Sequence, residues 1–417
     1  MDFLHRTWRE FAAFKQPGLK SDQLKQFGRQ SKEITHEYSQ LRYEITTNKE
    51  LTALEDDLPD CAHWNHQLQL LTEKMGCEPA YFDAPMLFSE CYVYRRVNNF
   101  YQRTAFFKDF DGFWEQKRHA LKESIFPTSL LSEHLFSMSS RLVSCQTNVR
   151  EEFLNFLELC LWGNKCDLSL SGGEKVNQSD QLFSDLTKNR PKILCNNSEA
   201  TWNFFQQLST KNVTSPVRLD VVMDNAGFET ISDFAFIIML YQTGLLNKDT
   251  STVRFFIKQI PWYVSDTTEQ DFHYTVDYLC KQSDWPQVAK FGQMIEELVQ
   301  AGRWTIVKHG YWTYPNDFSE MNKYSPDLYR DLAESDLLLF KGDLNYRKLV
   351  GDIDWPHTTR FEQALRGFTP TNILSLRTIK FNPVVHLESE EMVEKLPKNW
   401  YYSGEYALIH FLDRVNK

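Results

Sequence analysis

The feature that most constrains the fold is an alternation of short apolar runs with helical stretches after about residue 190. The runs are PKILCN (191–196), VRLDVVMD (217–224), VRFFIKQIPWYVSD (253–266), RWTIVKHGYW (303–312), DLLLFKGD (336–343) and NILSLRTIKF (372–381). Each run is suited to a buried strand, and the stretch ISDFAFIIMLYQTGLL between two of them is apolar enough for a core helix. Such alternation is typical of βαβ units, in which helices cover both faces of a mostly parallel sheet.

The first part of the chain has a different pattern. Its apolar residues recur every three or four positions throughout, which is the spacing of amphipathic helices. Clear examples are SDQLKQFGRQSKEITHEYSQLRYEI (21–45) and NVREEFLNFLELCLWG (148–163). We therefore predict an all-helical N-terminal domain over residues 1–165 and an α/β catalytic domain over 191–417. The polar, glycine-containing stretch SLSGGEKVNQSDQ lies in a predicted connecting segment over 166–190. The α/β domain should be a three-layer α/β/α sandwich with a mostly parallel, Rossmann-like sheet.

Composition excludes several classes of partner. The 417 residues carry a formal net charge of -10 without a basic cluster, which disfavours nucleic acid and anionic membranes as partners. The N-terminal stretch mixes charges among its apolar residues, so we expect neither a signal peptide nor a membrane span. The 8 cysteines form no CxxC pair, as expected for reduced thiols. We expect a soluble cytoplasmic protein, with the nucleus as a second compartment, and the sequence indicates no oligomeric state.

Three of the predicted strands end in an aspartate, at Asp224, Asp266 and Asp343. The carboxyl ends of parallel strands meet at one edge of a sheet, where ligands of open α/β sheets bind. With Asn225, the first two aspartates would supply hard oxygen ligands that suit Mg²⁺ or Mn²⁺ better than zinc. The alternative is that Asp224 and Asn225 only cap the helix that follows them.

Cations accompany these carboxylates, as an anionic substrate requires. The cationic and polar side chains near the strand ends are Lys341, Asn345, Arg347, Arg377, Thr378 and Lys380. Enzymes commonly bind and activate a phosphoryl group with a metal ion together with lysine and arginine side chains. Arg347 and Arg377 could instead form salt bridges at the edge of the sheet. We expect Lys380 beside the transferred phosphoryl group.

Several well-known motifs are absent. No GxxxxGK[ST] accompanies LSGGEK (170–175), so we interpret that stretch as loop composition. No GxGxxG follows a strand, which argues against a dinucleotide or an S-adenosylmethionine bound in the Rossmann manner. GDIDWPH (351–357) follows no apolar strand directly and is predicted to be a loop with a capped turn.

The residues in combination resemble the damage-control phosphatase family over nearly the whole chain. The resemblance rests on DNAGFE (224–229), KGDLNYRKL (341–349) and RTIK (377–380), behind a helical half with ECYVYRRV and LWGNKCDLSL. RTIK fits the RTxK motif of the subfamily that includes the acidic residue methyltransferase 1-like proteins. The resemblance implies a metal-dependent phosphatase supported by Mn²⁺, Co²⁺ or Ni²⁺ and in some cases Mg²⁺. Its substrates would be small phosphorylated metabolites such as fructose 1-phosphate-like sugar phosphates, in a metabolite damage-control role.

The resemblance also assigns residues. It makes Asp224, Asn225 and Asp266 the metal ligands and gives catalytic roles to Asp224, Asp266 and Lys380. The attacking group would be either Asp224 itself or a metal-bound water molecule. The substrate-contacting set would be Asp224, Asn225, Asp343, Leu344, Asn345, Tyr346, Arg347 and Lys380.

Two alternatives belong to other functional classes. Some family members are described as S-adenosylmethionine-dependent methyltransferases of protein carboxylates, so one alternative is a protein carboxyl (glutamate) O-methyltransferase. In that description Glu229 and Asp266 would contact the cofactor. The other alternative is a non-enzymatic protein that only binds the metal.

The helical half offers one further group of candidates in ECYVYRR. Glu90 and Tyr94 share one helical face, and Arg95 and Arg96 could reach over the edge of the sheet. Ordinary packing between helices is the alternative for all four.

Overall fold

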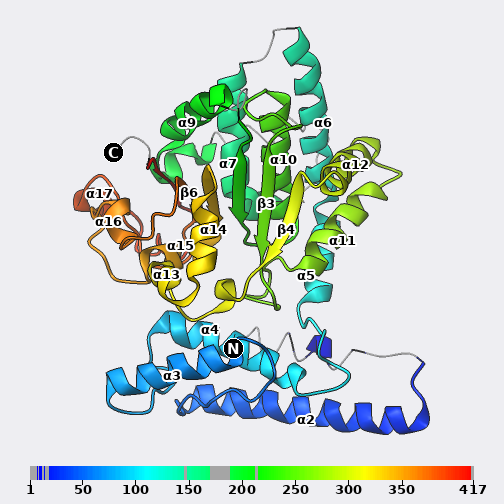
Figure 1. Cartoon of the computed structure of the whole chain (residues 1–417), viewed down its shortest axis with the longest axis vertical. Coiled ribbons are helices and arrows are strands. Elements are labelled where there is room, and N and C mark those ends of the chain that lie inside the picture. The colour runs from blue at the N-terminus through cyan, green and yellow to red at the C-terminus, as the bar shows by residue number, and fades with distance from the viewer. Residues whose placement is uncertain are drawn as a thin grey trace. The chain divides into compact units, whose positions relative to one another are not determined.

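A computed structural model describes residues 18–144, 148–169, 188–211 and 215–414, together with 7, 9–11 and 14. Contacts divide the chain into two compact units, each built from segments that are distant in sequence (Figure 1). Unit 1 comprises Met1–Arg118, Lys258–Thr268 and His309–Asn316, and unit 2 comprises His119–Ile257, Glu269–Lys308 and Asp317–Lys417. Within the described residues, no helix is both long enough and apolar enough to span a membrane.

Unit 2 contains the predicted sheet, which confirms the α/β fold class. The strands are β1 (Ile193–Asn196), β2 (Arg218–Val222), β3 (Thr252–Ile257), β4 (Trp304–Lys308), β5 (Leu337–Lys341), β6 (Ile373–Thr378) and β7 (Ala407–Leu412). Their order in the sheet is β1-β7-β6-β5-β2-β3-β4. All neighbouring strands are parallel except β6 and β7, which are antiparallel. The strand β7 was not among the runs predicted from the sequence.

Helices cover both faces of the sheet, because successive side chains of each strand point to opposite faces. The main helices of unit 2 are α6 (Ile125–Val143), α7 (Val149–Ser169), α9 (Ser198–Lys211), α10 (Phe228–Gln242), α11 (Glu269–Cys280), α12 (Pro286–Gln300), α14 (Pro326–Ala333) and α15 (Gly342–Val350). Short helices are α13 (Met321–Tyr324), α16 (Phe361–Ala364) and α17 (Glu390–Glu394). On β5, Leu339 packs into the core with α7 and α10, whereas the ring of Phe340 lies 5.3 Å from that of Phe318 on the other face.

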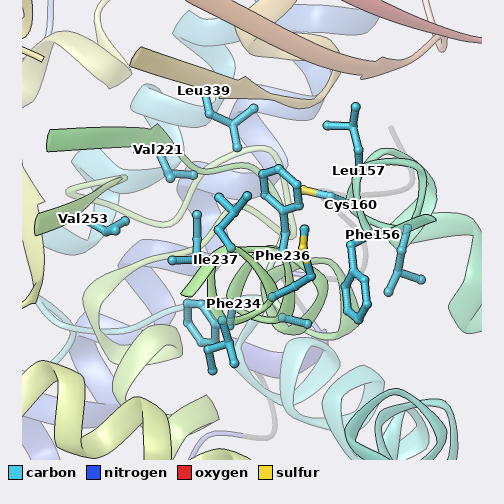
Figure 2. Packing of buried hydrophobic residues seen from close by; sticks show 14 of the residues in the cluster. Phe156, Leu157, Cys160, Val221, Phe234, Phe236, Ile237, Val253 and Leu339 are labelled. Carbon is cyan, nitrogen blue, oxygen red and sulfur yellow. The ribbon is translucent and has the colours of Figure 1, made fainter. Parts of the chain in front are cut away.

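The helix α10 occupies the centre of the main core. Figure 2 shows Phe236 and Ile237 of α10 between side chains of the strands and side chains of α7, and Phe234 lies in the same cluster. The first thirteen residues of α10, Phe228–Leu240, are buried, as expected for the apolar stretch between two strands. Most residues of α10 therefore have no contact with water, and a charged side chain on this helix needs a partner inside the protein.

The order of the strands creates a switch point between β2 and β5. From β2 the chain continues through α10 to β3, whereas from β5 it continues through α15 to β6 on the opposite side. Because the two connections diverge, the carboxyl ends of β2 and β5 lie at a topological switch point, the position at which open α/β sheets bind ligands.

One expected strand end is wrong. The strand β3 ends at Ile257, so Asp266 does not end a strand but lies in the loop that belongs to unit 1. Pro261 lacks the N–H group that a strand in the middle of a sheet must donate, which is why the apolar run does not continue the strand. In this loop Tyr263 and Val264 have φ angles of 41° and 70°. A β-branched residue rarely adopts this left-handed conformation, so the loop is held by its surroundings.

The compact units divide the helical half differently from the predicted boundary at residue 165, which itself stays a prediction. Unit 2 begins at His119 and so includes α6 and α7, and α7 packs against α10. Most of the predicted connecting segment lies outside the described residues, as does the LSGGEK stretch.

Unit 1 is built around three long helices, α2 (Ser21–Thr46), α3 (Cys61–Met75) and α4 (Met86–Gln102). The helix α5 (Trp114–Glu123) continues from this unit into unit 2. Arg95 of α4 is completely buried and donates hydrogen bonds of 2.7–2.9 Å to the carboxylates of Asp56 and Asp60. The guanidinium group of Arg95 is thus engaged inside unit 1 in packing between helices.

We predict that Arg95→Ala lowers the free energy of unfolding by about 3–5 kcal/mol, because it leaves two buried carboxylates without their cation. The exposed pair of Arg29 with Glu33 on α2 provides a control, and Arg29→Ala should cost no more than about 0.5 kcal/mol. Urea unfolding of both variants measures the difference. Similar losses in the two variants would show that the buried ion pair does not stabilise unit 1.

Candidate active site

The corner between β2 and α10 carries Asp224 and Asn225, two and three residues beyond the end of the strand. The Nδ2 group of Asn225 donates to Asp224 Oδ2 at 2.7 Å and to Glu229 Oε2 at 2.8 Å. The N-cap of α10 is Gly227, so neither Asp224 nor Asn225 occupies the capping position that was the alternative for them. The corner therefore gathers two carboxylates around one carboxamide.

The end of β5 approaches this corner through Gly342. A Cβ atom added to Gly342 would lie 1.9 Å from Oδ2 of Asp224, and the φ angle of Gly342 is +84°. Only glycine accommodates both the close carboxylate and this backbone conformation at little cost. The switch point thus places the carboxylate of Asp224 directly against the backbone that begins α15.

The predicted residue Asp343 links β5 to the RTIK stretch. Asp343 Oδ1 accepts hydrogen bonds from Arg377 Nε at 2.8 Å and from the backbone N–H of Lys380 at 3.1 Å. Arg377 is fully buried and also donates to the carbonyl oxygens of Phe381 and Pro383. The salt bridge that was the alternative for Arg377 is present, and it holds the segment that carries Lys380.

Lys380 itself is exposed at the end of this segment. Within the described residues its ammonium group forms no ion pair, whereas its backbone N–H is held by Asp343. A lysine in this position can bind an anion from solvent without first breaking a salt bridge.

Asn345 and Leu344 are part of the predicted substrate set, but both are buried in unit 2. Asn345 Nδ2 donates to the carbonyl oxygens of Lys341 and Met223 at 2.8 and 3.2 Å. Asn345 therefore ties the end of β2 to the end of β5 and supports the corner with its amide nitrogen.

Arg347 and Tyr346 are likewise engaged within unit 2. The guanidinium group of Arg347 forms a two-pronged pair with Asp352 at 2.8 and 2.9 Å and lies over the ring of Phe381. Tyr346 is completely buried, and its ring stacks on that of His410 with centroids 5.6 Å apart. The alternative of a salt bridge is thus observed for Arg347 too, and contact of either side chain with a substrate stays a prediction.

Sequence reasoning missed a buried ionic cluster at the end of β5. Lys341 Nζ, at the end of β5, donates to Asp233 Oδ1 at 2.6 Å, to the carbonyl oxygen of Cys160 at 2.5 Å and to Glu229 Oε1 at 3.4 Å. Complete burial raises the pKa of Asp233 to about 6, although Lys341 opposes the shift, so the pair is charged at neutral pH. The signal in the sequence was Asp233 itself, a carboxylate inside an apolar helix.

Both carboxylate oxygens of Glu229 are engaged in this network. One accepts from Asn225 and the other from Lys341. The methyltransferase alternative would place Glu229 against S-adenosylmethionine, but here its hydrogen bonds are made within unit 2.

The remaining candidates lie in unit 1. Asp266 and Lys258 are both buried and form an ion pair of 3.2 Å between Oδ2 and Nζ. Burial raises the pKa of Tyr94, and the charges of Glu90 and Asp266 raise it further. Because Asp266 and Asp224 belong to different units, their joint binding of a metal ion stays a prediction.

The donor chemistry of the corner fits a divalent metal ion. Among the described residues, no three or more His, Cys, Asp or Glu side chains form a metal-binding group, but the predicted set differs because it includes an amide. In unit 2 it comprises the carboxylate of Asp224 and the carboxamide of Asn225, both oxygen donors of the kind that Mg²⁺ and Mn²⁺ prefer. The glycine at position 342 leaves space for that carboxylate.

Comparison with known proteins gives a consistent result. Residues 13–396 match the model of a family described as the damage-control phosphatase ARMT1-like domain. The chain is 37% identical to damage-control phosphatase ARMT1 of Mus musculus over 418 residues, which cover 99% of this chain and 92% of that protein. The Homo sapiens protein of the same name is 34% identical over 421 residues, with the same coverage. The Xenopus tropicalis protein is 37% identical over 388 residues, 91% of this chain and 86% of that protein.

We predict that Gly342→Ala displaces the Asp224 carboxylate and weakens Mn²⁺ binding, because the new methyl group would overlap that carboxylate. Gly367→Ala is a matched control, since Gly367 also has a positive φ, of +91°, but has no atom within 4 Å of an added Cβ. Both variants should lose about 1–2 kcal/mol of stability from the left-handed backbone. Only Gly342→Ala should lose Mn²⁺ affinity in calorimetry, and equal affinities would contradict the close packing at this corner.

Proposed function

The chain belongs to the damage-control phosphatase family, and on that premise we propose that the corner between β2 and β5 hydrolyses phosphate esters of small metabolites. The observation that carries the proposal is the packing of the Asp224 carboxylate against Gly342 at the switch point of the sheet. The pairing of β2 with β5 and of β5 with β6 brings the Asp224 carboxylate, the beginning of α15 and the segment with Lys380 to the ends of adjacent strands. Phosphoryl transfer requires such a convergence of metal ligands and cations.

We propose that Asp224 and Asn225 hold the divalent ion, and the family resemblance adds Asp266 as a further ligand. When bound, the ion supplies Lewis-acid polarisation of the phosphoryl group. The family resemblance favours Mn²⁺, Co²⁺ or Ni²⁺. In this proposal Asp224 acts either as a ligand only or also as the attacking carboxylate.

Lys380 and Asp343 have separate tasks in the proposed reaction. The exposed ammonium group of Lys380 neutralises charge on the phosphoryl oxygens as the ester bond breaks. Asp343 positions Lys380 by accepting its backbone N–H through Oδ1. Oδ2 of Asp343 accepts no hydrogen bond within the described part of the chain, and the side chain is 16% exposed. Asp343 Oδ2 can therefore accept a hydrogen bond from a hydroxyl group of the substrate, which supports a sugar phosphate as the substrate.

We further propose that the protein acts in the cytoplasm. No disulfide bond joins the cysteines whose side chains the structure describes, as is usual in a reducing compartment. Small phosphorylated metabolites are also found there, so the proposed compartment and substrate class agree.

We predict that chelation of divalent ions abolishes hydrolysis of a sugar phosphate and that Mn²⁺, Co²⁺ or Ni²⁺ restores it. Asp224→Ala should prevent this restoration, because it removes a proposed ligand while the surrounding core remains. Release of inorganic phosphate measures the activity, and circular dichroism checks that the variant is folded. Full activity after exhaustive chelation would refute the role of the metal.

We predict that Lys380→Ala lowers kcat by roughly a hundred- to a thousandfold, as expected when a group that stabilises charge in the transition state is lost, at about 2.7–4 kcal/mol. Metal binding should be unchanged. Lys398→Ala is the control, because Lys398 is also exposed but lies outside the proposed site. Near-normal turnover of a folded, metal-loaded Lys380→Ala protein would remove Lys380 from the site.

A further inference from the structure

We infer that Glu229 and Lys341 are positioning residues that fix the orientation of the Asn225 carboxamide and thereby set the affinity for the metal ion. The inference rests on the proposed function, because it concerns how one of the proposed ligands is held. It assigns to Glu229 a role inside the protein, in place of the contact with S-adenosylmethionine that the methyltransferase alternative implies.

The first step is the hydrogen-bond count at Asn225. A carboxamide nitrogen has two hydrogens, and those of Asn225 are directed to Asp224 Oδ2 at 2.7 Å and Glu229 Oε2 at 2.8 Å. If the amide group were turned by 180°, its oxygen would face both carboxylates, and two acceptors would repel a third. The two carboxylates therefore determine which side of the amide presents Oδ1, the only atom of this side chain that can bind a hard metal ion.

The second step is the position of Glu229, which is buried in the first turn of α10. Its Oε1 faces the ammonium group of Lys341 at 3.4 Å, so one carboxylate bridges the cation and the amide. Lys341 is in turn fixed by the carbonyl oxygen of Cys160 and by Asp233. The chain of contacts runs from the rigid end of β5 to the proposed ligand.

The third step is a comparison of the two acidic partners of Lys341. Asp233 is closer to the ammonium group, at 2.6 Å, and also accepts a hydrogen bond from the thiol of Cys160 at 2.8 Å. The hydrogen bonds of Asp233 are made to Cys160 and Lys341, whereas the Asn225 amide donates to Asp224 and Glu229. Glu229 alone of the two connects Lys341 to the amide, so the two acids differ in function although they share one cation.

Replacement of Glu229 by glutamine keeps the size of the side chain but leaves it with a single acceptor oxygen, so it tests whether Glu229 orients the Asn225 amide. A glutamine can turn its oxygen towards Asn225 or towards Lys341 but cannot accept hydrogen bonds through both terminal atoms. One contact then becomes a repulsive pair of donors. If the glutamine oxygen faces Asn225, the contact with Lys341 is lost. If it faces Lys341, the Asn225 amide must turn over, which also breaks its hydrogen bond to Asp224.

The experiment is calorimetric titration of the full-length protein with Mn²⁺ for the wild type, Glu229→Gln and Asp233→Asn. We expect Glu229→Gln to weaken Mn²⁺ binding by about 10–100-fold, the usual effect of losing a group that orients a metal ligand. Asp233→Asn removes the same charge beside the same lysine and should change the Mn²⁺ affinity less than about threefold, since the amide of Asn225 keeps both acceptors. Raising the Mn²⁺ concentration should restore phosphatase activity to Glu229→Gln, a recovery that general unfolding would not show.

Unchanged Mn²⁺ affinity in Glu229→Gln would overturn the inference, and so would equal losses in Glu229→Gln and Asp233→Asn, which would indicate a simple effect of charge. If Glu229→Gln fails to fold, Glu229→Asp provides the same test. It keeps the charge near Lys341 but is one methylene too short to reach Asn225, and its Mn²⁺ affinity should fall about tenfold. Asp224→Ala separates this inference from the proposed function: if Asp224→Ala binds Mn²⁺ normally, the proposed metal site itself is wrong.

Discussion

The structure of unit 2 depends on how one buried cation is accommodated. The ammonium group of Lys341 has almost no exposure, and an isolated charge in such surroundings would cost several kcal/mol. The cation and its partners join three elements, because Cys160 lies on α7, Asp233 on α10 and Lys341 at the end of β5. Apolar side chains can pack in several related arrangements, whereas this set of directed contacts is satisfied in only one. The cluster therefore fixes the position of both helices at the edge of the sheet where the candidate site lies.

The candidate site has few chemically active groups and many groups that support them. Arg377, Asn345 and Arg347 are each engaged with carboxylates or backbone carbonyls, and they hold the segments on which the exposed Lys380 and the Asp224 carboxylate stand. Catalytic side chains lose little rotational freedom on binding when such a support already restrains them. The charged residues around this corner thus form two groups. Some can bind a ligand, and the others hold the ligand-binding residues in place.

The sequence predicted the fold class well and the candidate site in part. Strand ends were sufficient to bring Asp224, Asp343 and Lys380 to neighbouring strands, because parallel strands of known direction share an edge. The same reasoning failed for Asp266, since Pro261 ended the strand early and left that residue in a loop. The contacts of Lys341 could not be predicted, because nothing local indicates that the end of a strand will meet a residue 181 positions earlier in the chain.

The place of β7 in the sheet bears on the order in which the protein can be assembled. Among the described residues, the strand β1 pairs with β7 alone, and β7 joins it to β6. A ribosome therefore produces β1 long before its partner, and the strand remains outside the sheet until synthesis has passed residue 412. Contacts of such long sequence separation close slowly. The strands from β2 to β6 can pair as they emerge, but the edge formed by β1 is completed only after β7 has been made.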